Sequence, residues 1–193
     1  MSILADYEII NLCDVWKKGS MITPFYPTQR TSHGEEPVIS YGLSSYGYDI
    51  RIADEFNVAR GWKGDERFLD PKDPRDDNFI NVTTDILTLP PNTFALGRSV
   101  ERFKIPRDIL GICVGKSTYA RNGVIVNVTP LEPEWEGFLT IEISNTSPHN
   151  ALIYANEGIA QLIFHRASSA CLTSYADKKG KYQGQKGIEK GKV

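Results

Sequence analysis

The sequence predicts an all-β fold, which could be a sandwich, a barrel or a jelly roll. Between residue 79 and about residue 165 the chain is a series of short apolar runs, broken by turns rich in glycine, proline and asparagine. Short strands at near-regular spacing are typical of these folds. No alternation of strands with helical patterns occurs, which argues against a doubly wound nucleotide-binding fold. The runs are ILTL, TFALG, ILGICVG, VIVNVT, FLTIEIS, ALIYA and IAQLIF.

The composition predicts one globular domain. The chain has 193 residues, of which 40% are hydrophobic, and this is enough for a sizeable core. Its net charge of −2 argues against a large surface that coats nucleic acid. No apolar run approaches the ~18 residues that span a membrane, and the first residues lack the pattern of a secretion signal. We therefore expect neither nucleic acid nor a membrane as a partner.

The cysteines and histidines predict no metal site. Cys13, Cys113 and Cys171 are far apart and form no C-x-x-C pair, which favours reduced thiols in a cytoplasmic protein. The segment 33–35, HGE, matches the H-x-E of zinc-dependent base deaminases, but the P-C-x-x-C that those enzymes need is absent. The three histidines do not cluster in the sequence either.

The first element is predicted to be the only long helix. Ile9, Cys13 and Trp16 are four and three residues apart, which places them on one helical face, and residues 17–19 provide a stop. A half-buried strand is expected next, with Tyr48, Ile50 and Ile52 alternating with Asp49, Arg51 and Ala53. Residues 63–78 are charged and contain two Asp-Pro steps, which predicts a solvated surface loop.

The segment GKSTYARNG, residues 115–123, has the residue types of a phosphate-binding loop. It is not a Walker loop, because Gly111 is one residue too close to the Gly-Lys pair and no helix pattern follows. Lys116, Ser117, Thr118 and Arg121 still offer a point charge, two hydroxyl donors and a planar fork. From the residues alone, a phosphate site and a structural basic turn both remain open.

Glu142 is the candidate for proton transfer. Strand alternation in FLTIEIS, residues 138–144, places it on the opposite face from Leu139, Ile141 and Ile143. One interpretation is an exposed sheet face. The other is a carboxylate in a partly dry pocket, where its pKa would rise and suit it to move protons.

The last sixteen residues form a separate, tail-like segment. Residues 178–193 contain six lysines and four glycines, so we expect a domain over residues 1–177 followed by a flexible tail. The tail is either a solubilising extension or a flap that orders over an anionic ligand. The aromatic ring and amides of KYQGQ slightly favour the flap.

Four segments together resemble the dCTP deaminases of the dUTPase-related superfamily. They are SYGLSSYGYDIR, GKSTYARNGVIVNVTPLEPEWEGFLTIEISNTS, ANEGIAQLIF and KYQGQKG. The resemblance covers roughly residues 1–20 and 40–190. It implies a distorted jelly-roll or β-barrel of the dUTPase-like type, and a homotrimer with active sites between subunits. It also implies zinc-independent deamination of dCTP to dUTP, Mg²⁺ accompanying the triphosphate, and possible feedback inhibition by dTTP.

The resemblance also implies roles for individual residues. Glu142 matches the catalytic glutamate, which takes a proton from a water held near Ser117 and returns protons to the cytosine and its leaving ammonia. The nucleotide would be bound by the phosphate loop, the segment lining the base, and the tail. These residues are Lys116, Ser117, Thr118, Tyr119, Ala120, Arg121, Val128, Thr129, Pro130, Glu132, Thr140, Ile141, Gln161, Tyr175, Lys181 and Gln185.

Alternatives to a plain deaminase also remain. In dUTPases and bifunctional relatives, an aspartate orients a water against the α-phosphate. Glu132 occupies the corresponding position here, one methylene longer, and Trp135 replaces the usual tyrosine. Because a small misplacement of water is costly, we expect dUTP as the product. The alternatives are a bifunctional enzyme that gives dUMP and pyrophosphate, a dUTPase, and a nucleotide-binding trimer without turnover.

Overall fold

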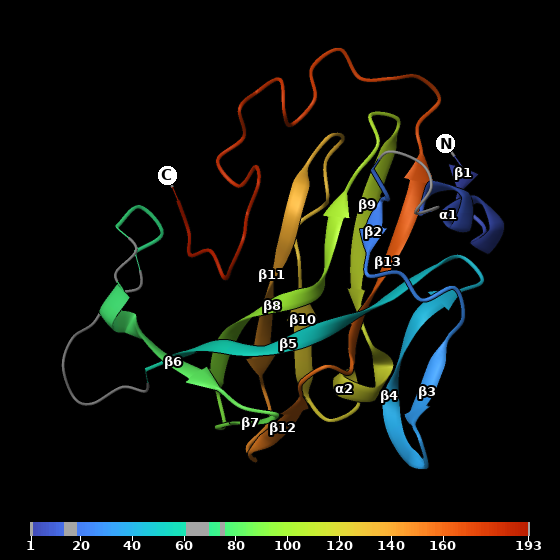
Figure 1. The fold of residues 1–193 in the computed structure, drawn as a ribbon. Coiled ribbons are helices and arrows are strands. Elements are labelled where there is room, and N and C mark those ends of the chain that lie inside the picture. Colours follow the sequence, from blue (N-terminus) through green and yellow to red (C-terminus); the bar gives the residue numbers. More distant parts are fainter. Residues whose placement is uncertain (1, 14–18, 61–69, 74–75, 193) are drawn as a thin grey trace.

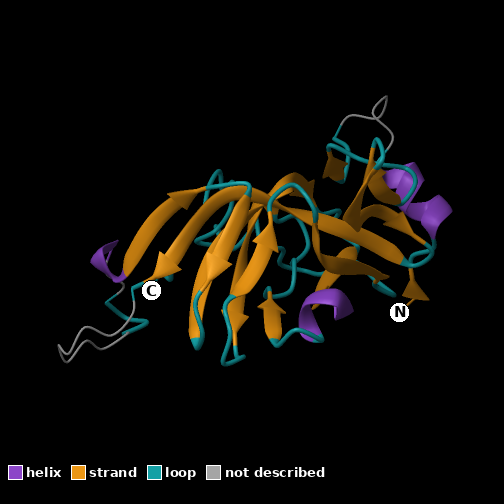
Figure 2. Ribbon diagram, turned by 90° about the horizontal axis from the view of Figure 1, so that it is seen from below, coloured by secondary structure: helices purple, strands orange, loops and turns teal. Residues whose placement is uncertain are grey.

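The computed structural model describes residues 2–13, 19–60, 70–73 and 76–192, and it confirms a mainly β fold (Figure 1). The strands curve together into an arched sheet, which Figure 2 shows from below. The elements in chain order are β1 (Ser2–Ile3), α1 (Asp6–Leu12), β2 (Ile22–Thr23), β3 (Arg30–His33), β4 (Glu36–Ser44), β5 (Gly47–Ala59), a 3-10 turn (Asp76–Asn78), β6 (Phe79–Thr83), β7 (Ile86–Leu89), β8 (Thr93–Lys104), β9 (Ile109–Gly115), α2 (Ser117–Ala120), β10 (Val124–Asn127), β11 (Glu136–Asn145), β12 (Ala151–Tyr154) and β13 (Gly158–Arg166).

Antiparallel pairing connects strands that are far apart in the sequence. In the described residues, the main sheet follows the order β1-β13-β5-β8-β11-β10, and β9 pairs with β13. Strand β6 pairs with β5, while β7 and β12 form a separate two-stranded sheet. The sheet thus brings β8, β10 and β11 side by side, and these strands carry the candidate site.

The apolar runs read from the sequence correspond to observed strands. ILTL and ILGICVG coincide with β7 and β9 residue for residue. In β11 the side chains alternate between half-buried and buried positions, as the pattern FLTIEIS predicts. Ile141 and Ile143 are fully buried in the core, so Glu142 faces the other way.

Residues 48–53 form part of a strand, β5, as predicted. The prediction that this strand is half-buried is wrong, because both of its faces are buried there. The polar face is covered by partners from distant segments. Asp49 accepts a hydrogen bond from Lys116 Nζ at 2.7 Å. Arg51 forms an ion pair with the fully buried Glu101 at 2.8 Å, and its guanidinium also contacts the rings of Tyr26 and Tyr41. Alternation alone does not reveal such charge pairing.

Helix α1 is shorter than the sequence suggests, and a second helix forms that the sequence does not predict. Helix α1 has seven residues and buries Ile9, with Cys13 buried directly after it, while Trp16 and residues 17–18 lie outside the described residues. Burial raises the pKa of the Cys13 thiol to about 12. A four-residue helix, α2, forms where the sequence predicts a turn without a helix. Much of the predicted loop 63–78 also lies outside the described residues.

Candidate active site

A cavity of about 710 Å³ lies where the middle of the main sheet meets the C-terminal segment. Strands β8 and β11, the segment after β10, and the tail all contribute side chains to it. Its lining residues are Phe79, Phe94, Leu96, Val128, Thr129, Pro130, Leu131, Glu132, Trp135, Leu139, Thr140, Glu142, Tyr175, Lys181, Tyr182, Gln185, Glu189, Lys190 and Gly191.

Glu142 enters this cavity from the middle of β11. Register places Leu96 of β8 opposite it on one side and Asn127 of β10 opposite it on the other. The Asn127 amide donates a long hydrogen bond to the Glu142 carboxylate, at 3.5 Å. Partial removal from water raises the pKa of Glu142 above its usual value. A hydrogen bond from its own backbone N–H, and then the one from Asn127, offset this only in part. A carboxylate in this setting can serve as base and then as acid.

The loop that follows β10 presents backbone groups and a held carboxylate. Leu131 exchanges two backbone hydrogen bonds with Gly111, which fix the loop against β9. Glu132 accepts a hydrogen bond from Lys178 Nζ at 2.6 Å. The Trp135 ring is buried, and its indole N–H donates to the Tyr182 carbonyl at 3.0 Å. The loop therefore has a fixed shape and is tied to the tail.

The tail lies across the open end of the sheet, as the red trace in Figure 1 shows. Gln185 pairs with Gly137 through a parallel bridge, and its carbonyl accepts from the Phe138 N–H at 2.9 Å. Its side-chain amide donates to the Thr140 hydroxyl, which also accepts from the Glu189 N–H at 2.9 Å. The tail thus supplies part of the cavity wall, and Lys181 lies in that part.

The predicted phosphate loop, residues 116–121, lies outside the lining of this cavity. It contains α2, which Figure 1 shows at the opposite end of the sheet from the tail. There the Lys116 Nζ donates hydrogen bonds to the Asp49 carboxylate at 2.7 Å and to the Ser40 hydroxyl at 3.1 Å. Tyr119 is buried, its hydroxyl accepts from the Tyr154 N–H, and burial raises its pKa to about 12.

The predicted residues therefore fall into two groups within one chain. Gln161 belongs with the loop group, because register places it beside Asp49, and its amide donates to the Ser44 hydroxyl at 2.8 Å. Ile141 points into the core beneath the cavity. The residues that the structure gathers in the cavity are Val128, Thr129, Pro130, Glu132, Thr140, Glu142, Tyr175, Lys181 and Gln185.

Sequence reasoning missed several side chains of the cavity. Phe79 and Phe94 form an edge-to-face pair with ring centroids 5.8 Å apart, and they come from β6 and β8. Leu96 and Asn127 reach Glu142 only through strand pairing. The sequence shows no signal for these residues, since pairing between distant strands cannot be read from periodicity.

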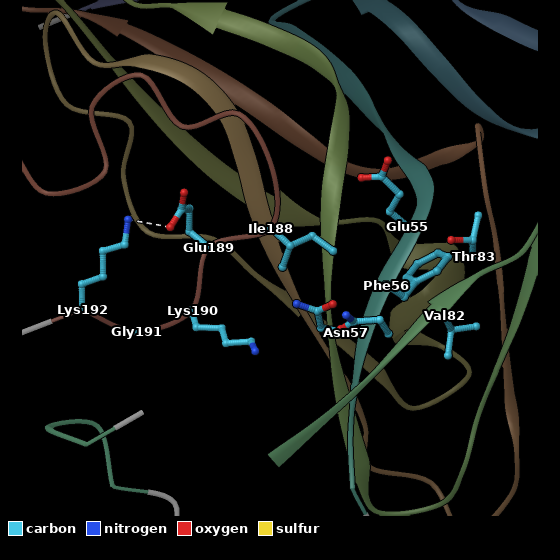
Figure 3. A pocket seen from close by; sticks show the side chains of 11 residues that line it. Glu55, Phe56, Asn57, Val82, Thr83, Ile188, Glu189, Lys190, Gly191 and Lys192 are labelled. Carbon is cyan, nitrogen blue, oxygen red and sulfur yellow. Dashed lines mark ion pairs between the residues drawn. The ribbon is translucent and has the colours of Figure 1, made fainter. Parts of the chain in front are cut away.

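A second cavity, of about 610 Å³, adjoins the first and shares Glu189, Lys190 and Gly191 with it (Figure 3). Figure 3 shows residues of β5 and β6, among them Phe56 and Asn57, on one side of this cavity and tail residues 188–192 on the other. None of the residues predicted from the sequence lines this cavity.

The described ranges lack two features that could have indicated a different kind of protein. No group of three or more His, Cys, Asp and Glu side chains there is arranged to hold a metal ion. Nor is any helix in these ranges long and apolar enough to cross a membrane.

Comparisons with known proteins agree with one another. A family model described as dCTP deaminase-like matches residues 23–167. A dCTP deaminase of Pseudomonas fluorescens (strain SBW25) is 53% identical over 188 residues, which cover 97% of each chain. A dCTP deaminase of Francisella philomiragia is 56% identical over 169 residues, which cover 88% of this chain and 89% of that one.

A solved structure supports the fold. The 2'-deoxycytidine 5'-triphosphate deaminase of Agrobacterium tumefaciens superposes with a TM-score of 0.57 at 18% identity. The match covers 89% of this chain and 49% of that one, so this chain spans about half the length of the solved protein.

Proposed function

This chain belongs to the dCTP deaminase-like family, and we propose on that premise that water replaces the C4 amino group of dCTP in the cavity around Glu142. The protein is accordingly a hydrolytic deaminase, with dUTP and ammonia as products. One observation carries this assignment to the cavity. Glu142 is a partly desolvated carboxylate with a raised pKa, and it lines a cavity of about 710 Å³ between a hydrogen-bonded loop and the tail.

Glu142 moves the protons in this mechanism. It accepts a proton from the water that attacks C4, and it delivers a proton to N3 of the ring. It then assists the transfer of a proton to the departing amine, so that water and dCTP become dUTP and ammonia. The pKa of Glu142 is raised, which shifts its titration toward the pH at which a group can both take and return a proton.

We propose that backbone groups of residues 128–130 recognise the cytosine edge. Val128 and Thr129 lie at the cavity next to Asn127, whose amide holds the Glu142 carboxylate. Pro130 has no N–H, so recognition there uses its carbonyl oxygen. A fixed carbonyl near C4 also helps hold the attacking water.

The complete site is proposed to combine two subunits of a homotrimer. Residues 116–121 and Gln161 do not line the cavity of their own chain, yet the loop has the chemistry of a phosphate grip. A neighbouring subunit would bring this loop to the cavity. Ser117 would then hold the water, and Arg121 and Lys116 would bind the phosphates of Mg²⁺-bound dCTP.

The tail is proposed to be a separate unit, residues 178–193, that closes over bound nucleotide. Its contacts to Thr140 and Glu132 support this role, because they join the tail to the wall and loop of the cavity. Lys181 adds a positive charge at the cavity, and Tyr175 an aromatic ring at the base of the tail.

The product is proposed to remain a triphosphate. Glu132 is held by Lys178 at 2.6 Å and is one methylene longer than an aspartate, so it is poorly placed to orient a water at the α-phosphate. The bifunctional alternative, which gives dUMP and pyrophosphate, stays open because Glu132 still lines the cavity. We also propose dTTP as a feedback inhibitor and, because dCTP is an intracellular nucleotide, a cytoplasmic location.

The test is to incubate the purified protein with Mg²⁺ and dCTP, and to measure ammonia and separate the nucleotides by chromatography. Equal amounts of ammonia and dUTP support the proposal. Ammonia with dUMP and pyrophosphate supports the bifunctional alternative, and dUTP cleavage without deamination supports a dUTPase. Binding of dCTP without any product indicates a nucleotide-binding trimer. Repeating the assay with added dTTP tests the inhibition.

A further inference from the structure

One arginine joins the base of the tail to the rest of the molecule. Arg107 lies in the turn between β8 and β9, and its guanidinium has acceptors on two separate segments. Nη1 donates to Glu134 Oε2 at 2.6 Å, and Nη2 donates to Asp177 Oδ2 at 2.8 Å. The same Nη2 lies 3.1 Å from the Leu172 carbonyl and 3.4 Å from that of Cys171. A planar fork suits such bridging.

The first of these acceptors belongs to the loop that forms part of the cavity. Glu134 has a φ of +62°, a conformation that few non-glycine residues adopt, so its neighbours must hold it. Its N–H donates to the Ile105 carbonyl at 3.0 Å, and its own carbonyl accepts from the Gln183 amide at 3.1 Å. Trp135, the next residue, lines the cavity.

The second acceptor shapes the base of the tail. Asp177 accepts from the Ser174 N–H at 3.0 Å, and the Ser174 hydroxyl accepts from the Asp177 N–H at 3.2 Å. The Ser174 N–H and the Arg107 guanidinium both lower the pKa of Asp177, so the carboxylate stays charged. This closed turn contains Tyr175, whose N–H donates to the Pro133 carbonyl at 2.9 Å and whose hydroxyl accepts from the Tyr182 N–H at 3.1 Å.

We infer that Arg107 is a positioning residue for the deaminase site, since it clamps the base of the tail to the cavity loop and so sets where Tyr175 and Tyr182 stand. The inference rests on the proposed function, because it requires the Glu142 cavity to be the substrate site. Arg107 itself does not line that cavity. Exposed ion pairs add little to global stability. Loss of the Arg107 contacts should therefore change the placement of Tyr175 and Tyr182, and hence substrate binding, more than the global stability of the protein.

The experiment compares Arg107→Gln with Arg107→Lys and with a matched control, Arg166→Gln. Arg166 pairs with Asp108 and Glu8, neither of which belongs to the tail, and its side chain is 37% exposed, against 38% for Arg107. For Arg107→Gln, we expect the KM for dCTP to rise about tenfold while kcat stays within about twofold. Hydrogen exchange in residues 171–185 should become faster. A lysine keeps the charge but cannot span both segments, so Arg107→Lys should be intermediate.

Each outcome has a distinct meaning. If the wild-type protein does not deaminate dCTP, the proposed function fails, and hydrogen exchange still reports on the clamp. If the wild type is active but Arg107→Gln matches Arg166→Gln in either KM or hydrogen exchange, the positioning role is overturned. Should Arg107→Gln fail to fold, Arg107→Lys and Asp177→Asn replace it. Their effects on KM should then be non-additive in the double variant, whereas additive effects contradict the clamp.

Discussion

The proposed chemistry depends on a single carboxylate, and its replacement by an amide is the most direct test. Glu142→Gln keeps the size and shape of the side chain but cannot accept a proton. We expect the variant to fold and bind dCTP, and deamination to fall by about two to four powers of ten. Ammonia release and dCTP binding by calorimetry measure the two properties separately.

A suitable control for this variant is Glu136→Gln, on the same strand. Glu136 lies outside the cavity lining and pairs with Arg102 at the surface. The control should retain wild-type activity. Appreciable turnover by Glu142→Gln would contradict the role of Glu142, and loss of dCTP binding would indicate a structural role instead.

The neighbours of Glu142 set the pH at which it works. Leu96 lies opposite Glu142 on β8 and is only 9% exposed, so it keeps water from the carboxyl. Burial raises the pKa of Glu142, and kcat/KM falls as pH drops through that pKa because the base becomes protonated. Leu96→Asn brings a polar group and should lower the pKa of Glu142. The acid limb of the pH–kcat/KM profile should therefore move to lower pH.

Leu96→Met is the control for that profile, since it keeps an apolar side chain of similar volume. Its acid limb should coincide with that of the wild type. An acid limb that stays in place or moves to higher pH in Leu96→Asn would show that desolvation by Leu96 does not govern the titration of Glu142.

Among the elements, the tail is the one whose removal is most informative. Truncation after Asp177 removes the partners of Thr140 and Glu132, and it leaves the Arg107–Asp177 contact in place. We expect kcat/KM for dCTP to fall by at least about a hundredfold, because positioning and exclusion of water are lost together. Steady-state kinetics measure this, and light scattering checks that assembly is unchanged.

The full-length variant Lys186→Gln controls for loss of charge from the tail. Lys186 is exposed and does not line the cavity, so this variant should behave like the wild type. If the truncated enzyme retained normal kinetics, the tail would be only a solubilising extension. Hydrogen exchange with and without dCTP further tests whether binding orders residues 178–192.

Strands were the elements most readily predicted from the sequence. Runs such as ILGICVG are apolar, β-branched and bounded by turn residues, so local preference and tertiary structure agree. Strand β5 departs from its pattern because Asp49 and Arg51 find partners in distant segments. Lys116, which follows β9 and is half-buried, pairs with Asp49, and the fully buried Glu101 of β8 pairs with Arg51. Helix α2 is too short for periodicity to reveal it.

At the level of the whole molecule, the proposal that two subunits share each site can be tested by mixing variants. Glu142→Gln and Arg121→Ala should each be inactive alone. Refolded together in equal amounts, they should form mixed trimers in which about a quarter of the sites combine an intact Glu142 with an intact Arg121 from a neighbour. Activity recovered on mixing measures this.

A control mixes each variant with refolded Glu142→Gln/Arg121→Ala, which supplies no further intact partner. Those mixtures should stay inactive if each site takes Glu142 and Arg121 from different chains, apart from any residual activity of the single variants. No recovery in the main experiment, in spite of confirmed subunit exchange, would contradict a shared site.

Only part of the candidate site could be predicted from the sequence, because the arrangement of the whole molecule determines the rest. Resemblance pointed to Glu142, Thr140 and Gln185, and the fold brings these together within one chain. Leu96 and Asn127 required knowledge of strand pairing. Whether Arg121 reaches the cavity, as proposed, would depend on assembly of the subunits, which no local property of one chain's sequence encodes.

The buried pair Arg51–Glu101 restricts how this fold can change over evolutionary time. Glu101 is fully buried, so the loss of Arg51 alone would strand a charge at a cost of roughly 3–5 kcal/mol. Replacing both by apolar residues carries no such penalty. Replacement of the two residues one after the other must therefore pass through a poorly folded single variant, whichever residue changes first. The two sites should covary among related chains, and single exchanges at either one should be purged by selection.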